Sequence, residues 1–92
     1  MKTYVLLFRE KATLDLEEIE SYYDQISTKI TNQFFEELRE TLNIVEQEPY
    51  LFQERYKQVK IATLHRFPYG IHYTISNDRI VILRILHFKK IL

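Results

Sequence analysis

The side chains best suited to chemistry in this sequence lie in its C-terminal half. His87 follows an apolar run over residues 80–86, and an imidazole pKa of about 6.5 lets it exchange a proton near neutral pH. Lys60 and Arg66 are six positions apart, so on one regular strand they share a face and can clamp phosphate groups or carboxylates. Tyr69, beside Pro68, can stack on a base or on a partner's side chain.

Each of these residues also has a purely structural interpretation. His87 could be a strand-end histidine satisfied by a backbone carbonyl, Lys60 and Arg66 could be basic groups on a solvated strand face, and Tyr69 could simply pack at the start of a strand. Arg84 lies three positions before His87 and so points to the opposite face of a regular strand. We expect Arg84 to pair with an acid of the helices, because sharing a site with His87 would need a bulge.

Charge is segregated along the chain, although the formal net charge is zero. Residues 1–54 hold five Lys/Arg and twelve Asp/Glu, a net charge of 5 − 12 = −7. Residues 55–92 hold eight Lys/Arg and one Asp, a net charge of 8 − 1 = +7, together with all three histidines. This asymmetry favours a basic surface for a nucleic acid or an acidic partner, the alternative being that the two halves neutralise each other within one fold.

Composition excludes several classes of site. The 92 residues fit one domain, 1–92. With no cysteine, disulfide frameworks, thiolate zinc sites and cysteine nucleophiles are excluded, and a single glycine excludes a glycine-rich phosphate loop. His65, His72 and His87 lack zinc-site spacing, so we expect neither metal nor cofactor.

No run is apolar enough for a membrane span or a signal peptide, so we expect a cytoplasmic protein that binds no membrane.

The elements that must position these residues follow from hydrophobic spacing. Residues 2–8 form a short apolar strand. Helical spacing begins near Glu10 or Thr13, breaks at Ser27 and Thr28, and resumes until Pro49. The period of strands then appears at 58–66, 69–76 and 80–86. The sequence therefore predicts an α+β domain in the order β-α-α-β-β-β, with a helical hairpin packed on one face of a mainly antiparallel four-stranded sheet.

Burial follows from the same spacing. Tyr73 shares a face with Ile71 and Ile75 and is expected in the core, whereas His72 falls on the other face. The last strand is apolar on both faces, which is typical of a strand covered on both sides. The helix aromatics are expected to pack in the core and the hairpin: Tyr22, Tyr23, Phe34 and Phe35.

Five segments of the chain together form a specific pattern: Ala12-x-x-Asp15-Leu16-x-x-Ile19-x-x-Tyr22-Tyr23, Pro49-Tyr50-Leu51-Phe52, Arg55-Tyr56-Lys57, Phe67-Pro68-Tyr69-Gly70-Ile71-His72-Tyr73 and residues 80–87. With these segments in this order and at this spacing, the chain resembles the RelE/ParE superfamily of bacterial type II toxin-antitoxin toxins over essentially its whole length. The ending His87-Phe88-Lys89-Lys90 and the Phe-Pro-Tyr segment favour the ParE side. Lys60 and Lys90 stand where relatives usually have arginine, which keeps the charge but loses bidentate geometry.

The resemblance implies three functional hypotheses. The first is a toxin that arrests growth without catalysis by binding a macromolecular target such as DNA gyrase. The second is a ribosome-dependent, metal-independent mRNA endoribonuclease, with His87, Lys60 and Arg66 as its catalytic residues. The third is an attenuated homologue that only binds an antitoxin.

The resemblance also implies the partners. A cognate antitoxin wraps the toxin, and the target is gyrase or the ribosome with mRNA. A homodimer or a toxin-antitoxin hetero-oligomer is compatible with the sequence. The residues expected to bind target or antitoxin are Lys60, Arg66, Tyr69, His87, Lys89 and Lys90.

Overall fold

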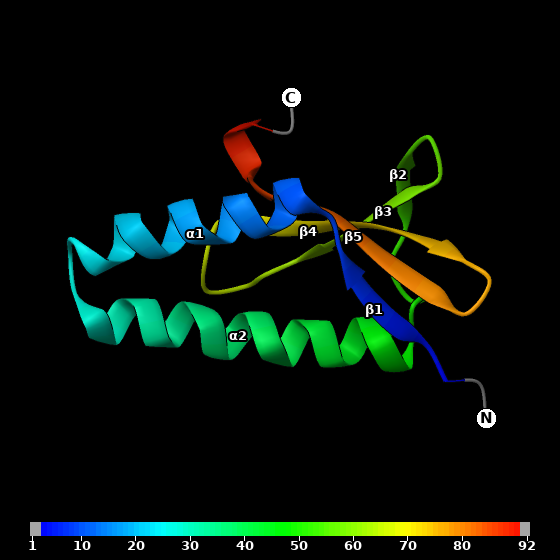
Figure 1. The fold of residues 1–92 in the computed structure, drawn as a ribbon, viewed down its shortest axis with the longest axis horizontal. Helices are drawn as coiled ribbons and strands as arrows, with labels where there is room; N and C mark the ends of the chain where they lie inside the picture. The colour runs from blue at the N-terminus through cyan, green and yellow to red at the C-terminus, as the bar shows by residue number, and fades with distance from the viewer. Residues whose placement is uncertain (1–2, 91–92) are drawn as a thin grey trace.

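The structure, a computed structural model, describes residues 3–90, with Lys90 described by its backbone alone. Lys2, where the first strand was predicted to start, lies outside this range. The elements in chain order are β1 (Val5–Phe8), α1 (Glu10–Asp24), α2 (Thr28–Gln47), β2 (Glu54–Tyr56), β3 (Val59–Thr63), β4 (Tyr69–Ser76), β5 (Arg79–His87) and the short 3-10 helix η1 (Phe88–Lys90) (Figure 1).

The strands form one sheet in the order β1-β5-β4-β3-β2. β1 runs parallel to β5, and the other neighbours are antiparallel. The predicted α+β class and the helical hairpin on a mainly antiparallel sheet are confirmed. The predicted strand count is wrong, because residues 54–56 add a fifth strand at the edge. All three residues of β2 are exposed. A strand with no buried face does not need alternating apolar and polar residues, so hydrophobic spacing does not reveal it in the sequence.

The helices begin and end where local signals place them. Ser27 caps α2 by accepting a hydrogen bond from the Lys29 amide (3.1 Å), which confirms the predicted break. α2 ends at Gln47, two residues before Pro49. Figure 1 shows α1 and α2 antiparallel and side by side. α1 also packs against β5, and α2 contacts β3, so the hairpin covers one face of the sheet.

The core lies between the hairpin and this face. Tyr73 is fully buried as predicted, and its hydroxyl donates a hydrogen bond to the Pro49 carbonyl (2.6 Å). Burial raises the pKa of Tyr73 to about 12. The other buried apolar residues of this cluster are Ala12, Ile19, Phe34, Leu38, Val45, Ala62, Leu64, Ile71, Ile80, Ile82 and Ile85.

Two burial predictions are wrong. β5 is not fully covered on both faces, because Ile80, Ile82 and Ile85 are buried while Val81 and Leu83 are only half-buried. The described helices cover only one face of the sheet. Tyr22 is 57% exposed rather than packed in the core; its ring rests edge-on against Tyr23, with the centroids 5.2 Å apart.

Candidate functional site

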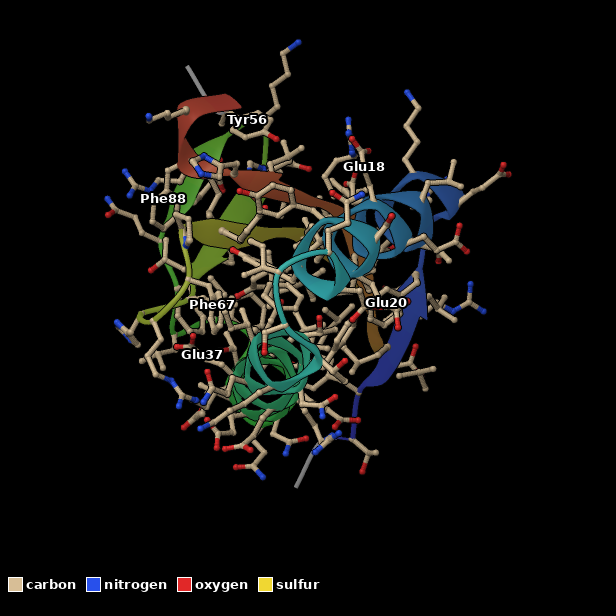
Figure 2. The ribbon with its side chains drawn as sticks, turned by 90° about the vertical axis from the view of Figure 1, so that its left-hand side faces the viewer. Glu18, Glu20, Glu37, Tyr56, Phe67 and Phe88 are labelled. Atoms are coloured by element: carbon tan, nitrogen blue, oxygen red, sulfur yellow. The ribbon has the colours of Figure 1, made fainter. Side chains whose placement is uncertain are left out.

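A cleft of about 400 Å³ lies between α1 and the C-terminal half of β5. It exists because β1 is short. The pairing of β1 with β5 ends at Phe8↔Ile82, so beyond Ile82 the side of β5 that faces away from β4 has no strand beside it. α1 runs along this open side. The cleft is lined by Glu18 and Tyr22 of α1, with Glu18 labelled on this helix in Figure 2, and by Tyr69, Arg84 and His87 of the sheet.

Asp15 and Arg84 join α1 to this part of β5. The Arg84 Nε and Nη2 donate to the two carboxylate oxygens of Asp15 at 2.8 and 2.9 Å, which confirms the predicted ion pair. The backbone amide of Ile85 donates to Asp15 Oδ2 (2.9 Å). Asp15 therefore satisfies an amide that faces the open side of β5. The hydrogen bonds that Asp15 accepts raise the pKa of the Arg84 guanidinium.

A β-bulge also shapes this strand. His72 pairs with Arg84, but Tyr73 pairs with Ile82, so Leu83 is the extra residue. The bulge precedes Arg84 and does not fall between Arg84 and His87. Both residues nevertheless line the cleft, because the Arg84 side chain reaches Asp15 at the open side of β5.

His87 and Tyr69 face each other across β4 and β5. Their backbone positions are paired, and their rings meet edge to face at 5.3 Å between centroids. The amide of Lys89 donates to His87 Nδ1 (3.1 Å). Burial, followed by the neighbouring Tyr23, raises the pKa of Tyr69 to about 12, so the Tyr69 hydroxyl keeps its proton at neutral pH. This pair presents aromatic surface to the cleft.

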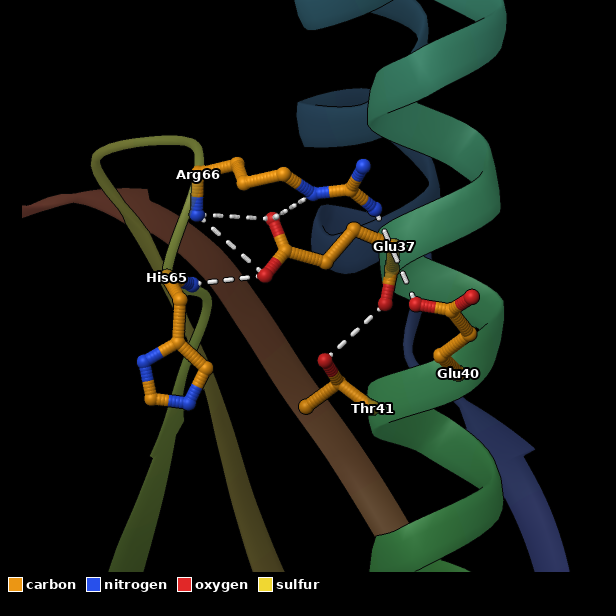
Figure 3. Close-up of polar contacts among 5 residues, drawn as sticks. All are labelled: Glu37, Glu40, Thr41, His65 and Arg66. Atoms are coloured by element: carbon orange, nitrogen blue, oxygen red, sulfur yellow. Dashed lines mark hydrogen bonds and ion pairs between the residues drawn. The ribbon is translucent and has the colours of Figure 1, made fainter.

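The structure places Lys60 and Arg66 with separate partners. The Lys60 ammonium donates to the Phe52 carbonyl (2.9 Å) and lies 5.6 Å from the Tyr50 ring centre. Arg66 lies beyond the end of β3 at Thr63, so the strand parity that would align it with Lys60 does not reach it. Its guanidinium lies near two α2 carboxylates, at 4.0 Å from Glu37 and 3.7 Å from Glu40 (Figure 3).

Glu37 is a structural residue that the sequence analysis missed. It is 5% exposed, and its carboxylate accepts the backbone amides of His65 (2.7 Å) and Arg66 (3.1 Å), as Figure 3 shows. A helix residue thereby anchors the loop that leads from β3 to β4. The signal was present in the sequence, because Glu37 follows Phe34 by three positions and so falls on the apolar stripe of α2.

His72, which its spacing placed on the face opposite Tyr73, is a second buried polar group, and its burial was not predicted. It is 1% exposed, and its Nδ1 lies 2.9 Å from the hydroxyl of Tyr56 on β2. Among the described residues, its Nε2 has no hydrogen-bond partner. Burial, and then the nearby positive charge of Arg84, lowers the pKa of His72. His72 is therefore neutral at pH 7.

The remaining predicted residues lie near the C-terminal end. Lys89 is exposed on η1, two residues after His87. The side chain of Lys90 lies outside the described part of the chain. Within residues 3–90, no group of three or more histidine and acidic side chains could hold a metal ion. In the same range, neither helix is long and apolar enough to cross a membrane.

Comparison with known proteins identifies relatives of this arrangement. Residues 6–92 match the family described as ParE toxin of type II toxin-antitoxin system, parDE. The solved structure entitled "Chromosomal ParDE TA system from P. aeruginosa" matches with a TM-score of 0.78 and 24% sequence identity, over 92% of this chain and 96% of that chain. At this identity, the structural likeness shows a shared fold. No curated protein sequence matches the chain.

Proposed function

The chain belongs to the ParE toxin family of type II toxin-antitoxin systems, and from this premise we propose that it arrests growth by binding DNA gyrase in the cytoplasm. A cognate antitoxin neutralises it by covering its surface. The family match over residues 6–92 carries this proposal. It also confirms the resemblance to the ParE side of the superfamily found in the sequence.

The positions of the candidate catalytic residues favour binding over catalysis. Metal-free RNA cleavage needs a base, an acid and cations around one phosphate. Here the Lys60 ammonium donates a hydrogen bond to the Phe52 carbonyl, and the Arg66 guanidinium lies beside the carboxylates of Glu37 and Glu40 on α2. His87 lies in the cleft beside Tyr69. A nuclease built on His87, Lys60 and Arg66 would need both cations to leave their present partners.

The cleft offers a surface suited to a protein partner. Tyr22 is exposed at its rim, and Tyr69 and His87 present aromatic faces inside it. Exposed aromatic side chains bring large contact areas with few rotatable bonds, and they are enriched at protein interfaces. We therefore assign Tyr69 and His87 to target or antitoxin binding, with Lys89 at the edge of the same surface.

Inducible expression of the chain alone in bacteria tests the proposal. Wild type, His87→Ala and the double variant Lys60→Ala/Arg66→Ala are compared at matched soluble levels, with Lys29→Ala/Arg39→Ala as a control that removes two exposed cations of α2. Growth, DNA supercoiling and mRNA integrity are read together. We expect arrest with altered supercoiling and intact transcripts.

The other outcomes separate the alternatives. Broken transcripts that become intact in His87→Ala would contradict gyrase binding and support the endoribonuclease. Normal growth at a high soluble level would contradict both toxic activities and leave the attenuated, antitoxin-binding homologue. A purified gyrase supercoiling reaction with added protein checks the target directly, because it contains neither ribosomes nor mRNA.

A further inference from the structure

The face of the sheet opposite the helical hairpin has a depression with a volume of about 420 Å³. Strand alternation places it on this face: Ile80 and Ile82 of β5 are buried in the core, and their neighbours Arg79 and Val81 line the depression. We call it the open-face depression. Its lining comes from β1, β4, β5 and the residue that follows β1: Leu7, Phe8, Arg9, Thr74, Ser76, Arg79 and Val81.

The polar side chains of the open-face depression are all able to donate hydrogen bonds. They are two guanidinium groups, from Arg9 and Arg79, and two hydroxyls, from Thr74 and Ser76. Neither arginine takes part in a salt bridge among the described residues. Within the same part of the chain, no acidic side chain lines the depression. It therefore suits a ligand that carries negative charge and offers acceptor oxygens.

The register of β1 with β5 spreads the two arginines along the sheet. Val5 pairs with Arg79, and the amide of Arg9 donates to the Ile82 carbonyl (2.9 Å). Arg9 comes four residues after Val5, so the two arginine backbones are roughly 13 Å apart along the strands, at about 3.3 Å per residue. Nucleic-acid strands carry one phosphate per nucleotide. Two cations spread in this way therefore match successive phosphates better than one inorganic phosphate.

The lining also favours a phosphate chain over an acidic protein segment. Each peptide residue other than proline brings a backbone N–H, which needs an acceptor when it is buried. The open-face depression has no carboxylate or carboxamide side chain to accept it. A phosphodiester has acceptor oxygens and no donor. Arginine and the hydroxyls of serine and threonine are also among the groups that most often contact DNA phosphates.

We propose that the open-face depression binds the phosphate backbone of DNA through Arg9 and Arg79, with the Thr74 and Ser76 hydroxyls beside them. This inference rests on the proposed function, because a toxin bound to DNA gyrase lies close to the DNA that the enzyme holds. Phosphate contacts carry no sequence information but fix orientation. The toxin therefore binds DNA-loaded gyrase more tightly than gyrase without DNA.

An NMR titration of the isotope-labelled chain tests the ligand without gyrase. A DNA duplex of about 12 base pairs is added at up to about 1 mM in about 0.05 M NaCl, where weak phosphate contacts are still populated. We expect the largest amide shifts at Thr74, Ser76, Arg79 and Val81. Raising NaCl to about 0.2 M should weaken binding about tenfold, since two phosphate contacts release counterions. Absence of shifts at these amides, or salt-independent binding, would overturn the proposal.

Three other anions separate the possible sources of negative charge. Inorganic phosphate should bind at least about tenfold more weakly than the duplex, because it engages one phosphate group at a time. A polyglutamate peptide of the same net charge should give no saturable shifts at the open-face depression. Phosphate binding as tight as that of the duplex would leave only a general anion site. Saturable binding of polyglutamate, or tighter binding of a single-stranded RNA of equal length, would overturn the assignment to DNA.

A matched pair of double variants tests the arginines on gyrase. Arg9→Gln/Arg79→Gln is compared with Lys29→Gln/Arg39→Gln, which removes two exposed cations of α2. We expect the first variant to bind DNA-loaded gyrase at least about tenfold more weakly than wild type and DNA-free gyrase within about twofold of it. The α2 variant should match wild type on both. Equal affinity of the two variants for DNA-loaded gyrase would contradict the proposal.

A single substitution repeats this test without removing an arginine. Ser76→Asp places a carboxylate in the open-face depression, and Ser21→Asp places one on an exposed position of α1. Only Ser76→Asp should weaken binding to the duplex, and thermal unfolding checks that each variant is folded. Equal duplex binding by the two folded variants would argue against the site. A chain that binds neither form of gyrase contradicts the proposed function, whereas the duplex titration still decides the depression.

Discussion

Two helix carboxylates perform the same task at the residue scale. Asp15 accepts the Ile85 amide where β1 no longer flanks β5, and Glu37 accepts the His65 and Arg66 amides where β3 has ended. Backbone amides left without a partner destabilise a fold when they are buried. Each carboxylate therefore replaces a missing strand neighbour and ties a helix to the sheet.

Removing the charge of Glu37 is expected to destabilise the protein. Glu37→Gln keeps the size of the side chain but replaces one acceptor oxygen with a donor NH2 group. The backbone amides of His65 and Arg66 both need an acceptor, so the free energy of unfolding should fall by about 2 kcal/mol. Glu40→Gln is the matched control, because Glu40 pairs with the same Arg66 but its side chain is 61% exposed. That change should lower stability by less than about 0.5 kcal/mol. Urea unfolding measures both, and equal losses would contradict the role of Glu37.

Acid is expected to destabilise the fold through His72. Burial and Arg84 lower its folded pKa below the unfolded value of 6.5, partly offset by Asp15. Between these two pKa values the unfolded chain binds more protons than the folded chain. The contribution of His72 to the free energy of unfolding is therefore fully present above pH 6.5, and it is lost as pH is lowered towards the folded pKa.

The measurement for His72 is urea unfolding between pH 7.5 and pH 5. We expect His72→Gln, which retains a polar group near the Tyr56 hydroxyl, to lose less stability over this range than wild type. Identical pH profiles for the two proteins would show that His72 does not contribute. His65 and His87 are present in both, so their titration cancels in the comparison.

At the scale of elements, the β2-β3 turn is the most strained connection described. Tyr56 pairs with Val59, which leaves Lys57 and Gln58 as a two-residue turn, and both have positive φ, 40° and 67°. Turns of this kind favour Asn-Gly, because other side chains are strained in the left-handed region. The β4-β5 turn has an asparagine, Asn77, at its positive-φ position (57°).

Replacing the strained pair is expected to stabilise the chain. Lys57→Asn/Gln58→Gly should raise the free energy of unfolding by about 1 kcal/mol and raise Tm by several degrees. Gln53→Gly is the control, because Gln53 is exposed and has no positive φ. Glycine there only adds freedom to the unfolded chain and should lower Tm. Calorimetry measures both variants, and a lower Tm for the turn variant would contradict the strain.

At the scale of the whole molecule, the fold brings the acidic and basic halves of the chain together. All three described salt bridges join a cation of residues 55–92 to a carboxylate of residues 1–54: Arg66 with Glu37, Arg66 with Glu40, and Arg84 with Asp15. Part of the charge segregation is therefore neutralised within the fold. Arg79 and Lys89 remain exposed and leave basic surface for partners.

Salt is expected to weaken the fold modestly. Raising NaCl from about 0.05 to 0.5 M screens attraction between the two halves, so the free energy of unfolding should fall by less than about 1 kcal/mol. Glu40→Gln removes the most exposed of the three ion pairs, in which the Arg66 and Glu40 side chains are 55% and 61% exposed, and should show a smaller fall because salt screens exposed pairs most. Urea unfolding at the two salt concentrations checks this, and a rise in wild-type stability would contradict it.

The sequence alone determined the features that depend on nearby residues. Hydrophobic spacing and the Ser27 cap placed the two helices and four of the five strands. The ion pair of Arg84 followed from a charge on a largely apolar strand, and the spacing of Tyr73 placed it in the core. These signals are local because backbone periodicity and capping act over a few residues. The family resemblance rested on the same ordered segments.

Only the tertiary structure decided the features that depend on register and packing. β2 has no buried face and forms by pairing with β3. The cleft depends on β1 ending opposite Ile82, and Lys60 and Arg66 separate because β3 ends at Thr63. His72 lies on the central strand between Ile61 and Arg84, and it meets the Tyr56 hydroxyl of β2. Each outcome joins residues distant in the chain, and spacing along the sequence does not encode where one strand stops beside another.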